Sequence, residues 1–464
     1  MENEKVFRKI WFYLFLFFIL LLVLNLGTDS PGQQVVREIV GGVLAVSFFL
    51  FYERPSAPFR SLWTFKFFLA FLVFQLFRSL FAFLIFHFHL PLNIPGIVLS
   101  QQIQSVFIWL FYSAFFYIAF LIFHNKNKAL PLLRLVSWTG FFLAINAIPP
   151  KLVKGYIGYH LPNGTYGYLY PLFYFHPWIP KYLISRFTHL NWVGDVLSLG
   201  FFSSLGLAFY SFRLLRQKMK SSLPADKKKT AISFLLYLTF ALTIGSAILL
   251  IFSRGTMIFA ILGFFLFLFI NLRKFRTHHQ RIFVSSIIAA AIFFTAWAGN
   301  LGKAWKEILT LNKEVNPSSN ATSFSLNIEG GKRALLIYKT HPLLGVGTRG
   351  YANVAYQFGN PKAYPLVKFQ SMCHYLQMLA EEGLGAYLYF LMLLSYIIEM
   401  LAGLFKTSSR FQFLAAMSLF AWVMSIYGHA WINHLMEHFS IAALVYLAMG
   451  AGLGILRPEF QHES

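Results

Sequence analysis

Long apolar runs alternate with short polar segments along almost the whole chain. A helix needs about 20 mostly apolar residues to cross about 30 Å of hydrocarbon, and lipid-facing backbone must be hydrogen-bonded within that helix. The pattern therefore predicts an all-α protein, a polytopic membrane helix bundle with about twelve transmembrane helices. The predicted spans lie near residues 10–27, 36–52, 62–87, 106–123, 130–148, 192–212, 231–252, 256–272, 282–299, 384–404, 411–428 and 439–456.

The composition excludes a soluble enzyme. Hydrophobic residues make up 58% of the 464 residues and charged residues 12%, whereas a soluble domain carries about 25% charged residues. Intrinsic disorder is excluded because aromatic residues reach 19%, and disordered chains are poor in them. Cys373 is the single cysteine, so the chain forms neither an internal disulfide nor a cysteine-based zinc cluster.

The net charge of +23 would suggest a nucleic-acid partner in a soluble chain. In a membrane protein, the bias of Lys and Arg toward short cytoplasmic loops is the first explanation, so we expect no nucleic acid. With the N-terminus inside and the spans alternating, 22 of the 39 Lys and Arg residues fall on the cytoplasmic side. This orientation places both termini in the cytoplasm and leaves two long external segments.

The two external segments differ in composition. Residues 149–191 are rich in Pro, Gly and Tyr, which predicts an irregular surface layer rather than a helix. Residues 300–383 carry nine Lys and Arg residues, and a positive external surface suits an anionic ligand; attraction to anionic headgroups is the alternative. We therefore divide the chain into helices at 1–299, an external helical subdomain at 300–383 and three final helices at 384–464.

Two arginines occupy similar places at the external entry of a predicted helix. Arg254 begins the eighth span, where free backbone N–H groups also favour an anion. Arg186 precedes the sixth span, with Asn191 close by. Guanidinium groups match phosphate oxygens in pairs, so together they suit a diphosphate at the headgroup plane. Arginines that merely anchor the helix ends at the interface are the alternative.

His374 lies in a predicted external helix over residues 371–390 that continues into the tenth span. His374, Met378 and Glu381 fall on one helix face. A histidine facing an aqueous cavity is a candidate general base, and a structural hydrogen-bonding histidine is the alternative. Cys373 is a weaker candidate nucleophile, because the sequence fixes no second histidine beside it.

The segment 341–356 contains three closely spaced glycines, Gly345, Gly347 and Gly350. Such a loop is able to bring backbone N–H groups close to a ligand, and a plain turn between external helices is the alternative. It is not a P-loop, because no lysine and hydroxyl follow the last glycine.

Two further features concern buried or clustered polar residues. Arg78 lies roughly 13 Å inside the third span at helical rise, so we expect it to face the interior of the bundle.

The last external turn holds His429, His434, Glu437 and His438. The i, i+4 spacing of two of these histidines permits a metal site, although a polar rim is the preferred interpretation.

Four motifs in this order resemble the O-antigen ligase and polymerase superfamily. They are Arg-x-Thr-x-x-Asn-x-x-Gly from Arg186 to Gly194, SRG from Ser253 to Gly255, HPLLGVG from His341 to Gly347, and His374 followed by LQMLAEEGLG up to Gly385. The resemblance spans about residues 185–390. Tyr375 departs from it, because the family usually has Asn after the histidine.

The resemblance implies a GT-C-like glycosyltransferase of the bacterial inner membrane with a periplasmic active site. It implies a donor glycan on undecaprenyl diphosphate and, in the ligase branch, lipid A core as the acceptor in lipopolysaccharide biosynthesis. It assigns diphosphate binding to Arg186 and Arg254 and the catalytic role to His374. Secondary candidates are Arg333, Arg349, Asn191 and Arg78.

The implied reaction needs a proton removed from a sugar hydroxyl and charge neutralised on the leaving diphosphate. The external acids include no closely spaced Asp pair for magnesium, so we expect metal-independent transfer without a cofactor. O-antigen ligation is the preferred function, and O-antigen polymerisation with the same donor is the alternative. A lipid-linked glycan transporter is an alternative of another class, disfavoured because transporters place binding groups near the midplane.

Overall fold

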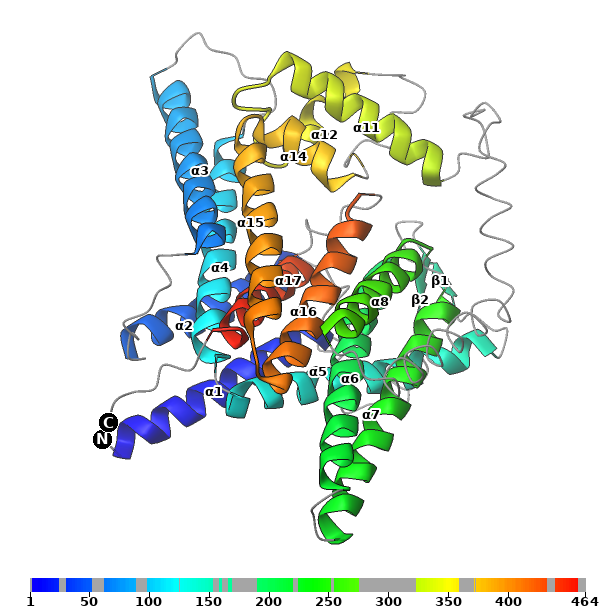
Figure 1. The fold of residues 1–464 in the computed structure, drawn as a ribbon. Coiled ribbons are helices and arrows are strands. Elements are labelled where there is room, and N and C mark those ends of the chain that lie inside the picture. Colours follow the sequence, from blue (N-terminus) through cyan, green and yellow to red (C-terminus); the bar gives the residue numbers. More distant parts are fainter. Residues whose placement is uncertain are drawn as a thin grey trace.

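A computed structural model shows a helical bundle with a small helical cap at one end (Figure 1). The structure describes residues 2–24, 31–51, 62–88, 98–124, 126–152, 158–160, 166–168, 190–219, 224–251, 254–274, 323–358, 371, 373–431 and 439–457. Among these residues, nine helices are long and apolar enough to cross a membrane. The predicted polytopic helical bundle is thereby confirmed.

Eleven of the twelve predicted spans coincide with helices, and the ninth, at 282–299, lies outside the described residues. The helices of the bundle are α1 (Glu2–Leu24), α2 (Pro31–Phe51), α3 (Trp63–His87), α4 (Leu99–Ile122), α5 (Lys126–Leu152), α6 (Leu190–Lys218), α7 (Pro224–Ile251), α8 (Arg254–Lys274), α15 (Gly385–Lys406), α16 (Arg410–His429) and α17 (Phe439–Ile455). The described apolar parts of α2 and α17 are shorter than the other nine, so the total of twelve spans stays a prediction.

The segment 149–191 differs in part from the irregular layer that its composition predicts. Helix α5 continues to Leu152, and two short strands follow, β1 (Gly158–His160) and β2 (Tyr166–Tyr168). They pair antiparallel with Gly158 opposite Tyr168. Tyrosine suits a strand, and this pair of strands was not anticipated by an all-α fold.

Helix α16 organises the bundle because it packs against α6, α8 and α17. Helix α6 also contacts α5 and α7, while α3 and α4 join the other side through α15 and α17. Figure 1 shows α3, α4, α15 and α16 standing beside one another, with α6, α7 and α8 next to them. The apolar core runs continuously through these helices, which buries their facing sides away from lipid and water.

The cap consists of α11 (Ser323–Thr340), α12 (Tyr351–Val354), the 3-10 turn Ala355–Gln357 and α14 (His374–Glu382). It has a small core of its own, which includes Ile337, Val346 and Tyr351. Helix α15 begins directly after α14, so the last helix of the cap leads straight into the bundle. The described part of the predicted 300–383 subdomain is mainly helical; its boundaries stay a prediction.

Candidate functional site

The starts of α6 and α8 lie beside each other at the end of the bundle that carries the cap. The Oγ1 of Thr256, in the first turn of α8, donates a hydrogen bond of 3.0 Å to Oδ1 of Asp195, in the first turns of α6. Both side chains are buried. The bond joins the two helix entries at which sequence analysis placed the arginines.

The arginines themselves are described only in part. Arg254 is the first residue of α8, and its side chain lies outside the described residues, as does that of Asn191. Arg186 lies outside them entirely. The backbone nevertheless brings the entry of α8 next to the entry of α6, as the two motifs require for a shared ligand.

The glycine of the first motif has a packing role. A Cβ at Gly194 would lie 2.8 Å from Cγ2 of Thr256, closer than nonbonded carbon atoms approach. Glycine therefore permits α6 and α8 to approach at their entries. The same approach brings the Thr256 hydroxyl to Asp195.

Asp195 also binds a histidine from a third helix. Nδ1 of His429, at the end of α16, lies 2.9 Å from Oδ1 and 3.1 Å from Oδ2 of Asp195. The indole Nε1 of Trp422 donates to the backbone carbonyl of Asp195 at 2.8 Å. We call Asp195, Thr256 and His429 the entry cluster; it ties α6, α8 and α16 together through buried polar contacts.

The entry cluster was not predicted from the sequence. The sequence placed His429 in a polar rim and gave no separate role to Asp195. The two residues are 234 positions apart, and no local pattern pairs them. The available signal was that Asp195 follows the motif glycine directly. His434, Glu437 and His438, the other residues of the rim, lie outside the described residues.

His374 is packed inside the molecule, whereas the sequence led us to expect an imidazole facing an aqueous cavity. Its side chain is buried, and its Nε2 lies 3.1 Å from the hydroxyl of Tyr389. Burial lowers the pKa of His374 to about 3, because the charged form loses its hydration. The imidazole is therefore neutral at ordinary pH.

The backbone of His374 reaches the entry cluster. Its N–H donates to the carbonyl of Ala430 at 2.9 Å, and Ala430 follows His429 directly. A single chain of contacts thus runs from His374 through the end of α16 to Asp195 and on to the first turn of α8. These contacts connect the backbone of His374 to the helix entry that begins with Arg254.

The glycine loop at 341–350 supports the cap. Gly345 has a φ of 63°, and a Cβ there would lie 2.3 Å from the carbonyl oxygen of Glu381, so only glycine fits. The N–H groups of Val346 and Gly347 donate to the carbonyls of Ala380 and Glu381, each at 3.0 Å. These amides hold α14, which agrees with the plain-turn interpretation of the loop.

Arg349 and Arg333 are engaged within the protein. The exposed Arg349 side chain donates to the Oε1 of Gln104 on α4 at 3.2 Å. Arg333 is buried; its Nε lies 3.2 Å from the Oε1 of Glu329, and its Nη1 donates to the carbonyl of Ala355 at 2.7 Å. The structure therefore places Arg333 inside the cap and Arg349 between the cap and α4.

Arg78 has the buried partner that the sequence left unnamed. Its guanidinium pairs with the carboxylate of Glu382 and contacts the hydroxyl of Thr348, and its Nη2 donates to the Oε1 of Gln75 at 2.6 Å. Arg78 and Glu382 are both buried. The pair joins α3 to the end of α14 and is a structural link between bundle and cap.

Burial also shifts the pKa values of two other ionisable groups near His374. The pKa of Glu381 is raised to about 7, chiefly because burial disfavours its carboxylate. Burial likewise raises the pKa of the Cys373 thiol, so the thiolate that a cysteine nucleophile needs is disfavoured. The raised pKa places the Glu381 carboxyl in the range that acid–base catalysis uses near neutral pH, whereas the lowered pKa of His374 makes its imidazole a weaker base.

One comparison with known proteins covers most of this region. Residues 238–391 match the family described as O-Antigen ligase. The match contains α7 from residue 238 onward, α8 with Arg254, the glycine loop and His374, and it begins after Arg186 and Asp195. A search of curated proteins finds no match.

Proposed function

Residues 238–391 form a domain of the O-antigen ligase superfamily, and from this premise we propose that the protein transfers a glycan from undecaprenyl diphosphate to lipid A core. The transfer takes place at the periplasmic face of the inner membrane. The observation that carries the proposal is the connection of the α8 entry, where Arg254 stands, to His374 through the entry cluster and Ala430.

The donor diphosphate binds at the entries of α6 and α8 in this proposal. Arg254 combines a guanidinium with the free N–H groups of a helix start, and both favour a phosphate anion. Arg186 precedes the adjacent helix and supplies the second guanidinium. Positive charge in place before the reaction stabilises the diphosphate as it leaves.

His374 takes the proton from the attacking hydroxyl. The hydroxyl oxygen bonds to the anomeric carbon, the bond from that carbon to the diphosphate oxygen breaks, and the proton passes to the imidazole. A neutral imidazole is required for this step, and burial keeps His374 neutral by lowering its pKa to about 3, which also weakens it as a base. Charging a buried imidazole is costly, and the adjacent anionic diphosphate offsets that cost.

Substitution tests the assignment. Arg254→Ala and His374→Ala should each lower glycan transfer in membranes by about a hundredfold or more, since oxyanion-stabilising and acid–base groups contribute factors of that size. Lys339→Ala removes an exposed cation of the same cap and should leave transfer unchanged. Normal transfer by both site variants, at normal abundance, would refute the site.

A deletion strain separates ligation from polymerisation. Loss of a ligase leaves free lipid A core together with long undecaprenyl-linked chains, whereas loss of a polymerase leaves core capped with a single repeat unit. Normal chain length with donor accumulating inside the cell would instead indicate transport. We expect the first outcome.

A further inference from the structure

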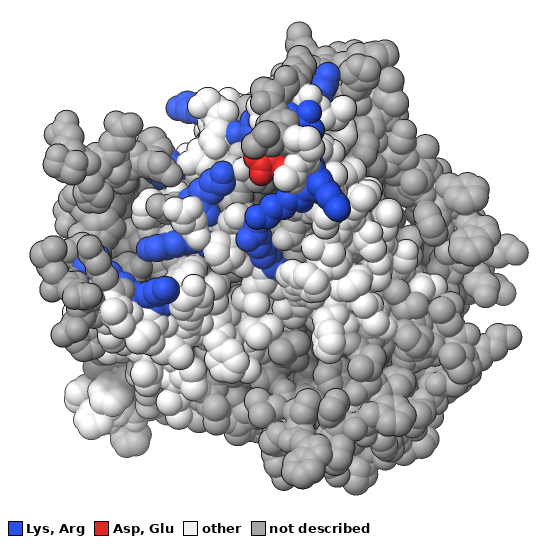
Figure 2. Space-filling model, turned by 90° about the horizontal axis from the view of Figure 1, so that it is seen from below, with Lys and Arg blue, Asp and Glu red and all other residues white. Residues whose placement is uncertain are grey.

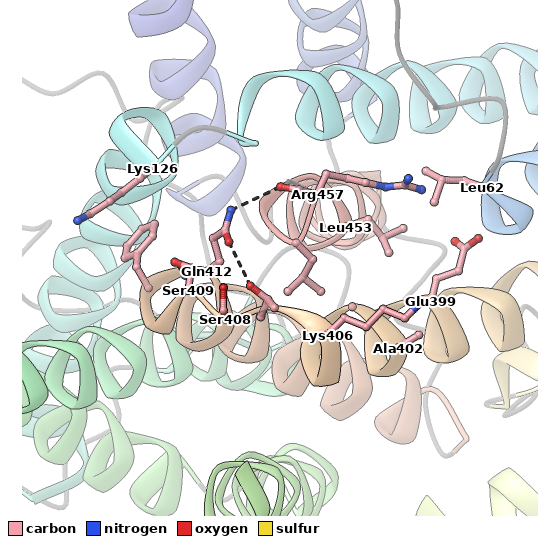
Figure 3. Close-up of a pocket in the computed structure, with 14 residues that line it drawn as sticks. Leu62, Lys126, Glu399, Ala402, Lys406, Ser408, Ser409, Gln412, Leu453 and Arg457 are labelled. Carbon is pink, nitrogen blue, oxygen red and sulfur yellow. Dashed lines mark hydrogen bonds between the residues drawn. The ribbon is translucent and has the colours of Figure 1, made fainter. Parts of the chain in front are cut away.

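A hollow of about 990 Å³ lies at the end of the bundle away from the cap (Figure 3). Helix α15 starts beside α14, and its 22 residues carry the chain about 33 Å along the bundle at 1.5 Å per residue. The hollow opens where α15 ends, between the start of α16 and the end of α17. It contains none of the motif residues, so it is separate from the proposed transfer site.

Three cations from three different segments line this hollow. They are Lys126 at the start of α5, Lys406 at the end of α15 and Arg457 just after α17. In the part of the chain that the structure describes, no carboxylate lies within ion-pair distance of any of them. Figure 2 shows Lys and Arg side chains gathered on this face. Cations that have no carboxylate partner among the described residues attract an anion to the hollow.

Among the described residues of the wall, Glu399 is the one carboxylate, and it is already hydrogen-bonded within the protein. Glu399 accepts hydrogen bonds from the backbone N–H of Trp63 at 2.6 Å and from the Oγ1 of Thr64 at 2.7 Å. Its two oxygens thereby cap the start of α3, where a negative charge is favourable. Glu399 therefore stabilises the start of α3 and does not neutralise the cations that line the hollow.

Hydroxyls and a helix start add polar groups to the wall, of which the Thr407 hydroxyl already donates to the Oε1 of Gln412 at 3.1 Å. Thr407, Ser408 and Ser409 form the turn between α15 and α16 along the wall. Ser409 caps the 20-residue helix α16, whose first turn favours an anion. At the rim of the hollow, the side-chain amide of Gln412 links the start of α16 to the residues after α17, because its Nε2 donates to the Arg457 carbonyl at 3.5 Å.

The side chains divide the hollow into two cationic ends. In Figure 3 the Arg457 guanidinium and the Lys406 side chain extend toward the end near Leu62 and Glu399, and Lys126 lies at the other end near Ser409 and Gln412. The wall between them is partly apolar, with Leu453 and Leu456. This mixture suits a phosphate group attached to an apolar body.

We infer that this hollow binds the phosphate of an anionic phospholipid headgroup. It lies where helices of the bundle end, and basic pockets between helix ends on the cytoplasmic side bind such headgroups. Its volume lies at the upper end of the range of small-ligand sites. The inference does not rest on the proposed function, because none of these residues belongs to the transfer site.

Native mass spectrometry of the full-length protein in detergent tests the inference, with phosphatidylglycerol, phosphatidylcholine and inorganic phosphate as probes. We expect phosphatidylglycerol to bind at least tenfold more tightly than phosphatidylcholine. The double substitution Lys406→Gln with Arg457→Gln should weaken phosphatidylglycerol binding at least tenfold. Arg457→Lys keeps the charge and should retain most of the binding.

A matched control removes the same charge from the same face. Lys228→Gln with Lys229→Gln takes two exposed lysines from the start of α7, away from the hollow, and should change binding by less than twofold. Equal binding by the wild type and the Lys406/Arg457 variant, with both folded by gel filtration, overturns the inference. Phosphate binding that the variant loses, without any preference between the lipids, overturns the lipid assignment in favour of a soluble phosphate.

Discussion

Burial decides the charge state of His374. The histidine has an ordinary pKa of 6.5 and a pKa of about 3 in the folded protein, so unfolding binds a proton between those pH values. Its contribution to stability is complete above pH 6.5 and is lost as pH falls toward 3, by about 1.4 kcal/mol for each pH unit. Glu381 acts in the opposite sense, because its raised pKa of about 7 gives stability that is lost as pH rises from 4.5 to 7.

This difference predicts the acid sensitivity of a variant. When the pH falls from 7 to 5, the melting temperature of His374→Gln should fall less than that of the wild type, because the glutamine amide takes up no proton on unfolding. Glu381→Gln removes the opposing contribution of the Glu381 carboxyl, so its melting temperature should fall more than that of the wild type. Thermal melts of purified protein at the two pH values measure both. Identical acid sensitivity of the wild type and His374→Gln would contradict the buried, neutral imidazole.

The buried pair Arg78–Glu382 predicts a large effect of a single substitution. Arg78→Gln leaves the Glu382 carboxylate buried without its cation, which costs about 3–5 kcal/mol. The melting temperature should therefore fall clearly. Lys66→Gln, at an exposed position of the same helix α3, is the control and should have little effect.

A second substitution checks the cause. Adding Glu382→Gln to Arg78→Gln removes the unpaired charge and should recover part of the lost stability. Equal melting temperatures for Arg78→Gln and Lys66→Gln would show that the pair does not join the cap to the bundle.

At the scale of elements, one hydroxyl holds two helix entries together. Thr256→Val keeps the shape of the side chain but removes the hydrogen bond to Asp195, leaving a buried carboxylate short of a donor. If Arg254 binds the diphosphate from the same turn, we expect the KM for donor to rise about tenfold in a membrane transfer assay. Thr256→Ser retains the hydroxyl and should restore near-normal transfer, whereas equally poor transfer by both variants would argue against the hydrogen bond.

The helices themselves follow from local pattern. The apolar runs predicted eleven helices that the structure contains, because the length needed to cross hydrocarbon and the 3.6-residue repeat are properties of short segments. The hairpin Gly158–Tyr168 was not predicted. Pairing two three-residue strands depends on the turn between them, for which Pro- and Gly-rich composition gives only a general signal.

At the scale of the whole molecule, the charge distribution predicts how transfer responds to metal removal. Cationic side chains at the helix entries, rather than a bound cation, neutralise the leaving diphosphate in the proposed function. Purified protein should therefore retain its transfer activity in excess chelator. Complete loss of activity that magnesium restores would contradict this mechanism.

The two proposed sites lie at opposite ends of the molecule. The cap end holds the entry cluster and His374, and the other end holds the cationic hollow. Because α15 and α16 each run from one end toward the other, a lipid bound in the hollow contacts the same helices that frame the transfer site. The two sites are nevertheless tested by independent variants.

The sequence alone determined the class of protein, the positions of its helices and the residue types suited to the chemistry, because hydrophobicity, helix length and motifs are written in short stretches of chain. The tertiary structure decided which ionisable side chains pair with one another. Glu382 pairs with Arg78 over 304 positions and Asp195 with His429 over 234. A buried ionisable group acquires its partner, its hydration and its proton affinity only when distant helices pack around it.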